Sequence, residues 1–518
     1  MLIRDILEES EKNYSEISAV KWLKKKEIHE RNYKELMNNV ITLRKGLLAE
    51  GFTGKHISLI GTSSVEWIES YLSIITGNTV AVPLDAGLPV EDLIDLINRS
   101  DSEGLFLSPK NHALLDRILA ECPKLKKIWL LQEEEAEAAD EKVVSLAELK
   151  AASKNTVTDS QRPSPDDVAT IIFTSGTTGK SKGVMLTQNN IATNVQAVDY
   201  TAEPGSVVLS VLPIHHAFCL IMDWLKGFSL GGTICINDSL LHMVKNMSVF
   251  KPNVMLMVPM MIETIYKRLS AADPAIPKKV LADNVFGGNL NIIFTGGAHL
   301  DPYYIDKFAE YGVEVLEGYG MSECSPVISS NTQAENKPGS VGKPLSNVEI
   351  SFDNGEILVK GSSVMKGYYH MPQETEETLK DGWLHTGDKG YLDDDGFLFI
   401  NGRVKNLIIL SNGENISPEE IENKLALDNL VGEVIVTGES NGLTARIYPE
   451  PEVVQAKGLN ADTIRTELQS FLDKYNKNQP TYRQITGLVV RKNPFIRSST
   501  KKIKRQEALI DEPIQPTT

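Results

Sequence analysis

The segment TSGTTGKSKG, residues 174–183, is dense in hydroxyls, glycines and lysines, and it follows the strand-like run Ile171 to Phe173. Glycines allow backbone N–H groups to converge on an oxyanion, hydroxyls add donors, and Lys180 and Lys182 add positive charge. The segment therefore predicts a phosphate-binding loop, with a polar surface turn as the alternative. Gly179, Lys180 and Ser181 match the end of the P-loop pattern GxxxxGK[ST], but Thr174 stands where the first glycine is required, which argues against a P-loop NTPase.

Five further motifs follow this loop in order along the chain. They are GYGMSE (318–323), GWLHTGD (382–388), GRVKNLI (402–408), GENISPEEIE (413–422) and STKKIKR (499–505). Together with the loop they resemble the signature of the adenylate-forming superfamily of acyl-CoA synthetases, adenylation domains and luciferases. Residues 286–302 and 499–505 are closest to the long-chain fatty acyl-CoA synthetases.

The resemblance implies that ATP and Mg²⁺ are bound. An aromatic face suits adenine, a carboxylate suits the ribose hydroxyls and a guanidinium suits a phosphate or ribose oxygen, and these roles fall to Tyr319, Asp388 and Arg403. The backbone around Gly297 and Ala298 would line the adenine and acyl site. The remaining nucleotide-binding residues implied are Thr174, Ser175, Gly176, Thr177, Thr178, Gly179, Lys182, Gly318 and Gly320.

Four residues are expected to act in catalysis. By resemblance, Ser322 supplies a hydroxyl to the α-phosphate, although threonine is usual there, and Glu323 supplies a hard oxygen ligand to Mg²⁺. Lys502 matches the lysine that bridges the carboxylate and the α-phosphate during adenylation, with Lys501 standing where glycine is usual. His216, in LPIHHAF, matches the residue that flanks the carboxylate and gates the acyl pocket; a core histidine is the alternative.

The resemblance also implies two domains that rotate relative to each other. An N-terminal domain over residues 1–402 would bind ATP and the acid, a hinge over 403–405 would contain Lys405, and a mobile C-terminal domain would cover 406–518. Rotation about Lys405 would bring the backbone of Gly413, Glu414 and Asn415 to line the channel for the pantetheine of CoA. The phosphopantetheine of an acyl carrier protein would fit the same channel.

The acid is expected to be a fatty acid. Adenylation domains for α-amino acids commonly place an aspartate after the gating residue to hold the ammonium group, whereas this chain has Ala217. Three alternatives stay open: a ligase that loads a carrier protein, a non-catalytic nucleotide-binding homologue, and luciferase-type oxidation. The intact Glu323, Asp388, Arg403 and Lys502 argue against the non-catalytic alternative.

The elements that must position these residues alternate between helix and strand. Leucines and valines at helical spacing from Leu36 to Leu47 predict a helix, His56 to Ile60 a strand, Val65 to Ile75 a helix and Val254 to Met257 a strand. This alternation predicts layered α/β subdomains. Beyond Lys337, short glycine-punctuated runs predict hairpins and a small barrel-like β unit, followed by a compact α/β tail.

Composition excludes several classes of protein. The chain of 518 residues carries a formal charge of −16, so polynucleotides and anionic membrane surfaces would repel it. Four cysteines lie far apart without a CxxC pair, and the first residues contain no signal-type apolar run. We therefore expect a cytoplasmic protein without a transmembrane segment and without nucleic acid as a partner.

Overall fold

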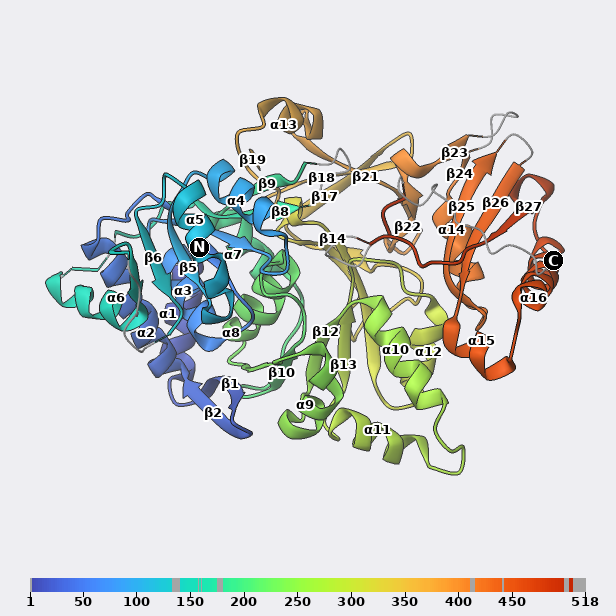
Figure 1. Cartoon of the computed structure of the whole chain (residues 1–518), viewed down its shortest axis with the longest axis horizontal. Helices are drawn as coiled ribbons and strands as arrows, with labels where there is room; N and C mark the ends of the chain where they lie inside the picture. Colours follow the sequence, from blue (N-terminus) through green and yellow to red (C-terminus); the bar gives the residue numbers. More distant parts are fainter. Residues whose placement is uncertain are drawn as a thin grey trace. The chain divides into compact units, whose positions relative to one another are not determined.

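A computed structural model describes residues 2–132, 140–156, 158–159, 161–174, 180–409, 415–439, 442–497 and 503–505. The chain is mixed α/β, as the sequence predicts, and its helices and strands are labelled in Figure 1. It divides into two compact units. The larger unit comprises Met1–Ser351, Val359–His385 and Asp394–Leu398, and the smaller comprises Phe352–Leu358, Thr386–Asp393 and Phe399–Thr518.

Among the described residues of the larger unit, eight strands form one sheet that is parallel from β8 to β7 and antiparallel at β9 and β19. In spatial order the strands are β19 (Gly367–Tyr368), β9 (Lys182–Thr187), β8 (Val168–Thr174), β4 (Val80–Leu84), β3 (His56–Ile60), β5 (Ser102–Leu107), β6 (Lys127–Leu130) and β7 (Val143–Ser145).

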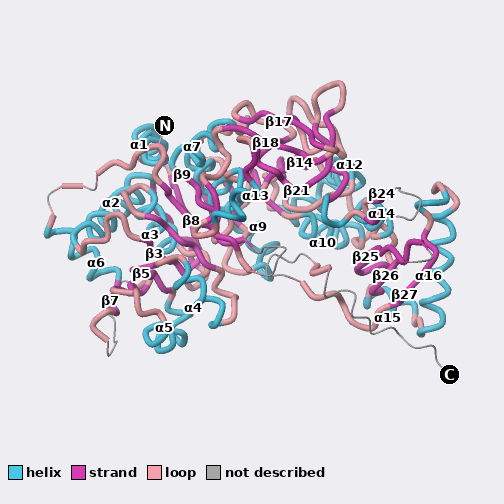
Figure 2. Tube along the Cα trace, turned by 90° about the horizontal axis from the view of Figure 1, so that it is seen from above, coloured by secondary structure: helices cyan, strands magenta, loops and turns pink. Residues whose placement is uncertain are grey.

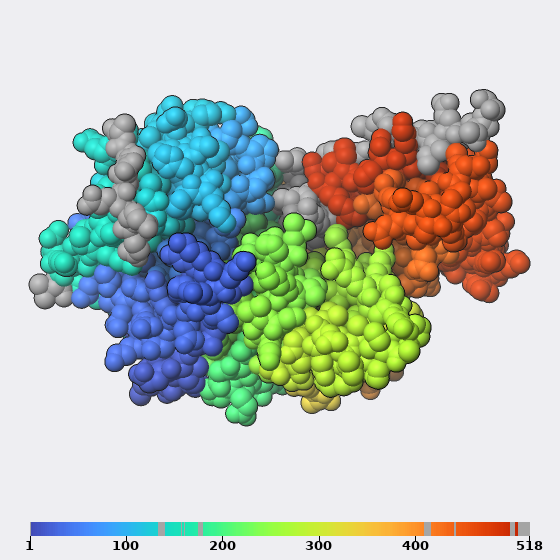
Figure 3. All heavy atoms as spheres, turned by 60° about the horizontal axis from the view of Figure 1, so that its bottom comes forward, coloured from blue at the N-terminus to red at the C-terminus, as the bar shows by residue number. Residues whose placement is uncertain are grey.

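A second sheet of the same unit has nine strands within the described ranges, and its central strands from β14 to β1 are parallel. In spatial order they are β16 (Lys343–Pro344), β15 (Val327–Ser330), β14 (Glu314–Gly320), β13 (Ile292–Thr295), β12 (Val254–Met257), β10 (Val207–Ser210), β11 (Thr233–Ile236), β1 (Ser18–Lys24) and β2 (Glu27–Asn32). The pairing of β1 with β11 places the N-terminal segment against a segment far along the chain. On the surface, Figure 3 shows blue N-terminal atoms beside green ones.

Helices cover both sheets, and α2, α3 and α6 pack together beside the eight-stranded sheet (Figures 1 and 2). The helices of the larger unit are α1 (Ile3–Tyr14), α2 (Tyr33–Ala49), α3 (Val65–Ile75), α4 (Val90–Arg99), α5 (Leu115–Glu121), α6 (Leu146–Ala152), α7 (Gln188–Ala197), α8 (Gly227–Ser229), α9 (Met243–Phe250), α10 (Pro259–Ser270), α11 (Lys278–Phe286), α12 (Pro302–Ala309) and α13 (Pro372–Thr378).

The start of α2 illustrates how the sequence sets these boundaries. The side chain of Asn32 accepts a hydrogen bond of 2.8 Å from the backbone of Glu35, and the Glu35 carboxylate accepts one of 3.1 Å in return. This reciprocal cap satisfies two amide donors that the first helical turn leaves without partners. Leu36 and Val40, one turn apart, then face the core and are buried, as the helical spacing predicts.

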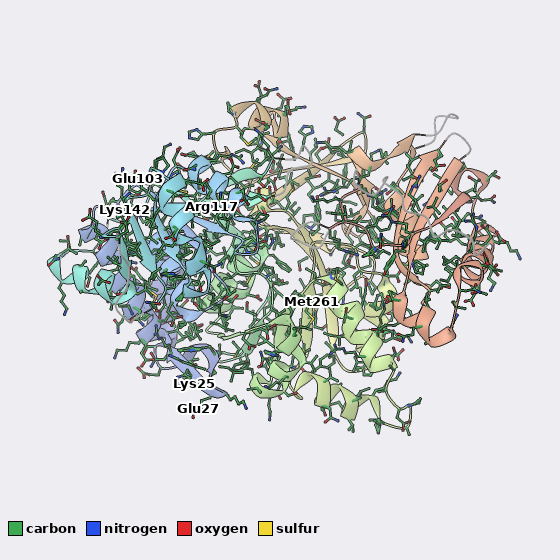
Figure 4. All side chains as sticks on the ribbon, in the orientation of Figure 1. Lys25, Glu27, Glu103, Arg117, Lys142 and Met261 are labelled. Carbon is green, nitrogen blue, oxygen red and sulfur yellow. The ribbon has the colours of Figure 1, made fainter. Side chains whose placement is uncertain are left out.

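The core of the nine-stranded sheet is formed by side chains of its strands and of α9 to α12. Met255 and Ile293, on β12 and β13, are fully buried against Phe286 and Phe308 of the covering helices. Met261, labelled on the first turn of α10 in Figure 4, packs partly buried against the same cluster. The side chains between the nine-stranded sheet and these helices are thus closely packed. The loops that connect the parallel strands to the next elements begin at the carboxyl ends of the strands.

Within its described residues, the smaller unit contains a three-stranded sheet in the order β25-β26-β27, packed with helices (Figure 2). Its strands and helices are β25 (Val431–Glu439), β26 (Gly442–Pro449), β27 (Ile485–Val490), α14 (Pro418–Leu425), α15 (Pro451–Lys457) and α16 (Ala461–Asn476). Two short strands, β23 (Ile408–Ile409) and β24 (Asn415–Ile416), pair with each other.

The barrel-like β unit predicted after Lys337 is confirmed as a five-stranded half-barrel sheet in the described part of the chain. The division between the two units passes through it. Its strands are β17 (Val348–Asp353), β18 (Glu356–Gly361), β20 (Leu379–Lys380), β21 (Trp383–Leu392) and β22 (Leu398–Arg403).

Candidate functional site

The predicted phosphate loop joins the antiparallel strands β8 and β9. Thr174 ends β8, Lys182 begins β9, and the two are opposite each other in the ladder, so the ends of the loop are held together. Lys180 and Ser181 are described as well. Ser175, Gly176, Thr177, Thr178 and Gly179 lie outside the described residues, and their roles stay predictions.

Arg99, at the end of α4, contacts both ends of this loop. Its Nη2 donates a hydrogen bond of 2.7 Å to the carbonyl of Ser181, and its guanidinium carbon lies 5.6 Å from the centre of the Phe173 ring. One cation thereby fixes the last residue before β9 and the residue before Thr174. No sequence pattern indicates this contact, because an arginine on an amphipathic helix normally faces solvent.

Lys182 is connected to Glu323 through Tyr368, which the sequence analysis did not single out. The ammonium nitrogen of Lys182 lies 4.6 Å from the centre of the Tyr368 ring. The Tyr368 hydroxyl donates a hydrogen bond of 2.8 Å to Oε1 of Glu323. Two predicted site residues, from two sheets, therefore contact one buried tyrosine.

Glu323 is held in a short 3-10 turn, Ser322–Cys324, that follows β14. Its carbonyl accepts a hydrogen bond of 2.8 Å from the backbone of Met365, and its side chain is buried. Buried Asn194, on α7, donates to the carbonyls of Cys324 and Val327 and accepts from the Val327 amide. The turn that carries the predicted metal ligand is thus fixed by hydrogen bonds on both sides.

The two segments predicted to line the adenine lie at the carboxyl ends of neighbouring strands. Gly297 and Ala298 follow β13, and Gly318 to Gly320 end β14, which pairs with β13 in parallel register. Gly297 has a positive φ of 82°, a conformation that glycine adopts without steric cost. Tyr319 is half-buried. Because parallel strands end at one edge of a sheet, the structure brings these segments together.

A buried carboxyl joins the same two segments. Glu317, next to Gly318, accepts a hydrogen bond of 3.3 Å on Oε1 from the backbone of Leu300. Burial, with a smaller effect from Asp301, raises the pKa of Glu317 to about 8 although the Leu300 amide opposes this. Its Oε2 and the hydroxyl of the opposite Thr295 are buried, and neither has a hydrogen-bond partner in the described part of the chain.

His216 follows β10 at the same edge and precedes a π-helix, Phe218–Lys226. Its ring centre lies 4.4 Å from that of His215, whose Nε2 is 3.8 Å from Oδ2 of Asp85. Burial lowers the pKa of His215 below its ordinary value, and Asp85 opposes that shift. β12 and β13 separate β10 from β14, so His216 and the Glu323 turn leave the same sheet at different strands.

Asp388 and Arg403 belong to the smaller unit, on β21 and β22. Nε of Arg403 donates a hydrogen bond of 2.8 Å to Oδ1 of Asp388. The structure thus brings the predicted ribose ligand, Asp388, into contact with the residue predicted to reach ribose or phosphate. The Asp388 side chain is buried and that of Arg403 is 48% exposed. The guanidinium therefore retains an exposed face with which a nucleotide could interact.

Lys405 lies exposed in a 3-10 turn, Val404–Asn406, directly after β22. The neighbouring Asn406 donates a hydrogen bond of 2.6 Å to Glu419 of α14. Gly413, Glu414 and Lys502 lie outside the described residues, as does the side chain of Asn415, which begins β24. The roles of these residues stay predictions.

The residues on both sides of Lys502 are anchored within the smaller unit. Arg497 forms an ion pair of 2.7 Å with Glu433, and an antiparallel bridge joins Arg497 to Ile503. Arg505 pairs with Glu422, a buried carboxylate of α14. Burial raises the pKa of Glu422 to about 7 even though Arg505 opposes the rise.

None of the described helices is long and apolar enough to cross a membrane. The four cysteines are buried and unpaired with one another, in keeping with the absence of a CxxC pattern.

Two family models match most of the chain. The family model described as "AMP-binding enzyme" matches residues 7–369, and that described as "AMP-binding enzyme C-terminal domain" matches residues 405–511. The chain is similar to long-chain-fatty-acid–CoA ligase 5 of Rattus norvegicus, with 28% identity over 92% of this chain and 82% of that protein. It is also similar to feruloyl-CoA synthase of an Amycolatopsis species, with 30% identity over 76% of this chain and 77% of that protein.

The fold of the chain is also similar to that of a solved structure. The anthranilate CoA ligase AuaEII, in complex with anthranoyl-AMP, aligns with a TM-score of 0.83 over 98% of this chain and 96% of that chain. The sequence identity is 19%, so the likeness concerns the fold alone.

Proposed function

The chain belongs to the AMP-binding enzyme family, and on that premise we propose that it is an AMP-forming acid:thiol ligase. It activates a carboxylic acid with ATP and passes the acyl group to the thiol of CoA. The contacts of Tyr368 with Lys182 and Glu323 support this reaction most directly. They connect a phosphate-loop cation and a carboxylate suited to Mg²⁺ through one buried side chain.

The reaction proceeds in two steps. A carboxylate oxygen attacks the α-phosphorus of ATP, the bond between that phosphorus and the bridging oxygen breaks, and pyrophosphate leaves past Lys182. Lys502 stabilises the negative charge that develops between carboxylate and α-phosphate. The thiol of CoA then attacks the acyl carbon, AMP leaves with the oxygen it received from the acid, and the thiol proton goes to solvent. The chain contributes mainly orientation and charge stabilisation.

Glu323 fits the role of a Mg²⁺ ligand. No group of three or more His, Cys, Asp or Glu side chains in the described ranges could hold a metal by itself. Mg²⁺ in phosphoryl-transfer sites is commonly held by one or two carboxylates and completed by substrate phosphates and water. A single buried carboxylate near a phosphate loop matches that ligand set, and bound Mg²⁺ would neutralise charge on the leaving pyrophosphate.

A fatty acid is the proposed substrate. The rat relative is a long-chain-fatty-acid–CoA ligase by name, and Ala217, buried at 2% exposure, offers no carboxylate to an α-ammonium group. The similarity to a feruloyl-CoA synthase makes an aryl acid the second candidate. A carrier-protein phosphopantetheine is the alternative acceptor to CoA.

Pyrophosphate release, measured across a panel of acids, tests both parts of the proposal. The panel contains saturated fatty acids of increasing length, ferulate, oxalate and α-amino acids, and mass spectrometry identifies the product formed with CoA or with a carrier protein. We expect release with fatty acids and an acyl-CoA product. Pyrophosphate release with ferulate alone would contradict a fatty acid as the substrate. If no acid in the panel causes pyrophosphate release, the proposed ligase activity is contradicted.

Separate assays of the two half-reactions test the role proposed for Lys502. Lys502→Ala should abolish pyrophosphate release while thioester formation from synthetic acyl-AMP continues, because the lysine acts only in adenylation. Lys504→Ala, two residues further along, is the matched control and should affect neither step. Equal loss of both half-reactions in Lys502→Ala would contradict the assignment.

A further inference from the structure

Tyr368 is held in place by backbone pairing with the strand that carries Lys182. β19 pairs antiparallel with β9, with Tyr368 opposite Val184. The amide of Tyr369 donates a hydrogen bond of 2.8 Å to the carbonyl of Gly183, and that of Lys366 donates one of 3.0 Å to Met185. Tyr368 is therefore fixed from both sides relative to the start of β9 (Figure 1).

The Tyr368 ring makes a cation–π contact with the Lys182 ammonium. The ring is 5% exposed, and the ammonium nitrogen lies 4.6 Å from its centre. A cation over an aromatic face is attracted by the ring quadrupole, and the attraction strengthens where water is excluded. The ring thus limits the positions that the lysine can occupy beside the phosphate loop.

The hydroxyl of the same side chain engages one oxygen of Glu323, the 2.8 Å hydrogen bond being buried. A phenol hydroxyl is neutral at physiological pH and a carboxylate oxygen accepts, so the hydroxyl is the donor in this hydrogen bond. A donor on Oε1 sets the rotation of the carboxylate and favours Oε2 as the oxygen presented to a cation.

The next residue provides an internal comparison. Tyr369 directly follows β19, and its side chain makes different contacts from that of Tyr368. Its hydroxyl donates a hydrogen bond of 2.8 Å to Oδ2 of Asp101, a carboxylate that also accepts from His370. Tyr369 therefore has the same chemistry and nearly the same backbone position, but a different carboxylate partner.

We propose that Tyr368 is a positioning residue for adenylation. Its ring holds the Lys182 ammonium beside the phosphate loop, and its hydroxyl orients Glu323 toward Mg²⁺. This inference rests on the proposed function, because adenylation is the step in which Lys182 and Glu323 would both act. It separates into two parts: the hydroxyl serves the metal ligand, and the ring serves the phosphate-loop cation. Each part can be removed without the other.

Tyr368→Phe removes only the hydroxyl, and Tyr368→Leu removes the hydroxyl and the aromatic face. For Tyr368→Phe we expect the Mg²⁺ concentration for half-maximal pyrophosphate release to rise about tenfold, with the KM of the acid changed by less than about twofold. Calorimetric titration with ATP in EDTA should give wild-type affinity for Tyr368→Phe and about fivefold weaker binding for Tyr368→Leu. Tyr369→Phe, the matched control, should match the wild type in each measurement.

The calorimetric readout keeps the inference distinct from the proposed function, since ATP binding with and without Mg²⁺ requires no acid substrate. If Tyr368→Phe and Tyr369→Phe give the same Mg²⁺ dependence, the role of the hydroxyl is refuted. If Tyr368→Leu binds metal-free ATP as tightly as Tyr368→Phe, the role of the ring is refuted. If the wild type binds ATP but releases no pyrophosphate with any acid, the ligase proposal fails. Calorimetry in EDTA then still decides the role of the ring, and the Mg²⁺ dependence of ATP binding decides the role of the hydroxyl.

Discussion

Substitution of Gly320 by alanine should disrupt the site more than any other single methyl group added to the adenine-lining segments. A Cβ at Gly320 would lie 2.0 Å from the carbonyl oxygen of Pro326 and 2.8 Å from its carbonyl carbon. Both atoms are backbone, and Gly320 pairs with Val327 at an irregular point of the ladder between β14 and β15. Carbon atoms in proteins essentially never approach closer than 3.0 Å in such contacts, so the strands must separate by about 1 Å.

Gly297 provides the comparison, because a Cβ there would meet nothing within 4 Å. Its positive φ of 82° would cost alanine about 1–2 kcal/mol of backbone strain without displacing a neighbour. For Gly320→Ala we expect a loss of about 3 kcal/mol in the free energy of unfolding, at the upper end for overpacking. Glu323 follows three residues later, and a displacement of about 1 Å at a catalytic group can reduce kcat/KM about 100-fold.

Urea unfolding followed by tryptophan fluorescence measures the first quantity, and pyrophosphate release at varied ATP measures the second. The free energy of unfolding and kcat/KM should both be much lower for Gly320→Ala than for Gly297→Ala. Calorimetry should show directly that Gly320→Ala binds ATP more weakly. If Gly320→Ala proves as stable and active as Gly297→Ala, the close approach of β14 and β15 does not position the Glu323 turn.

Three further predictions concern charged groups. Arg99→Ala should raise the KM of ATP about tenfold, with the KM of the acid nearly unchanged, because Arg99 holds the ends of the phosphate loop; equal changes in both constants would contradict this. Arg505→Gln should slow adenylation about tenfold and spare thioester formation from acyl-AMP, whereas Arg483→Gln, which breaks an ion pair with the same helix, should spare both. Glu317 has its pKa raised to about 8, so the native state retains a proton that the unfolded state loses, and stability should fall as pH rises from about 4.5 to 8. Urea midpoints across this range should vary less in Glu317→Gln, and an unchanged pH dependence would refute the buried carboxyl as its source.

Much of the fold follows from local sequence. The bounds of β3, α3 and β12 coincide with the predicted runs from His56, Val65 and Val254. Buried parallel strands read as short continuous apolar runs, and α3 is a largely apolar segment in which nearly every residue is buried. The motif GYGMSE is contiguous in sequence, so the structure places its glycines at the end of β14 and Glu323 in the short 3-10 turn that follows.

The contacts that connect the predicted site residues could not be predicted in this way. Tyr368 reaches Lys182 because a strand of two residues pairs with one far earlier in the chain, and no periodicity reports such pairing. The contacts of Arg99 and Glu317 could not be predicted for a similar reason. The role of an arginine at a helix end or of a glutamate in a strand depends on neighbours that are distant in sequence. Lys502 and most of the phosphate loop stay predictions from the motif resemblance.

The most direct test of the central claim follows the oxygen atoms of the acid. With a carboxylic acid labelled at both oxygens with oxygen-18, attack on the α-phosphorus places one labelled oxygen in AMP for each thioester formed, because AMP departs with the bridging oxygen. Mass spectrometry of the nucleotide and phosphate products should therefore find the label in AMP and none in pyrophosphate. Label in inorganic phosphate together with ADP, or unlabelled AMP during thioester formation, would contradict an acyl-adenylate mechanism.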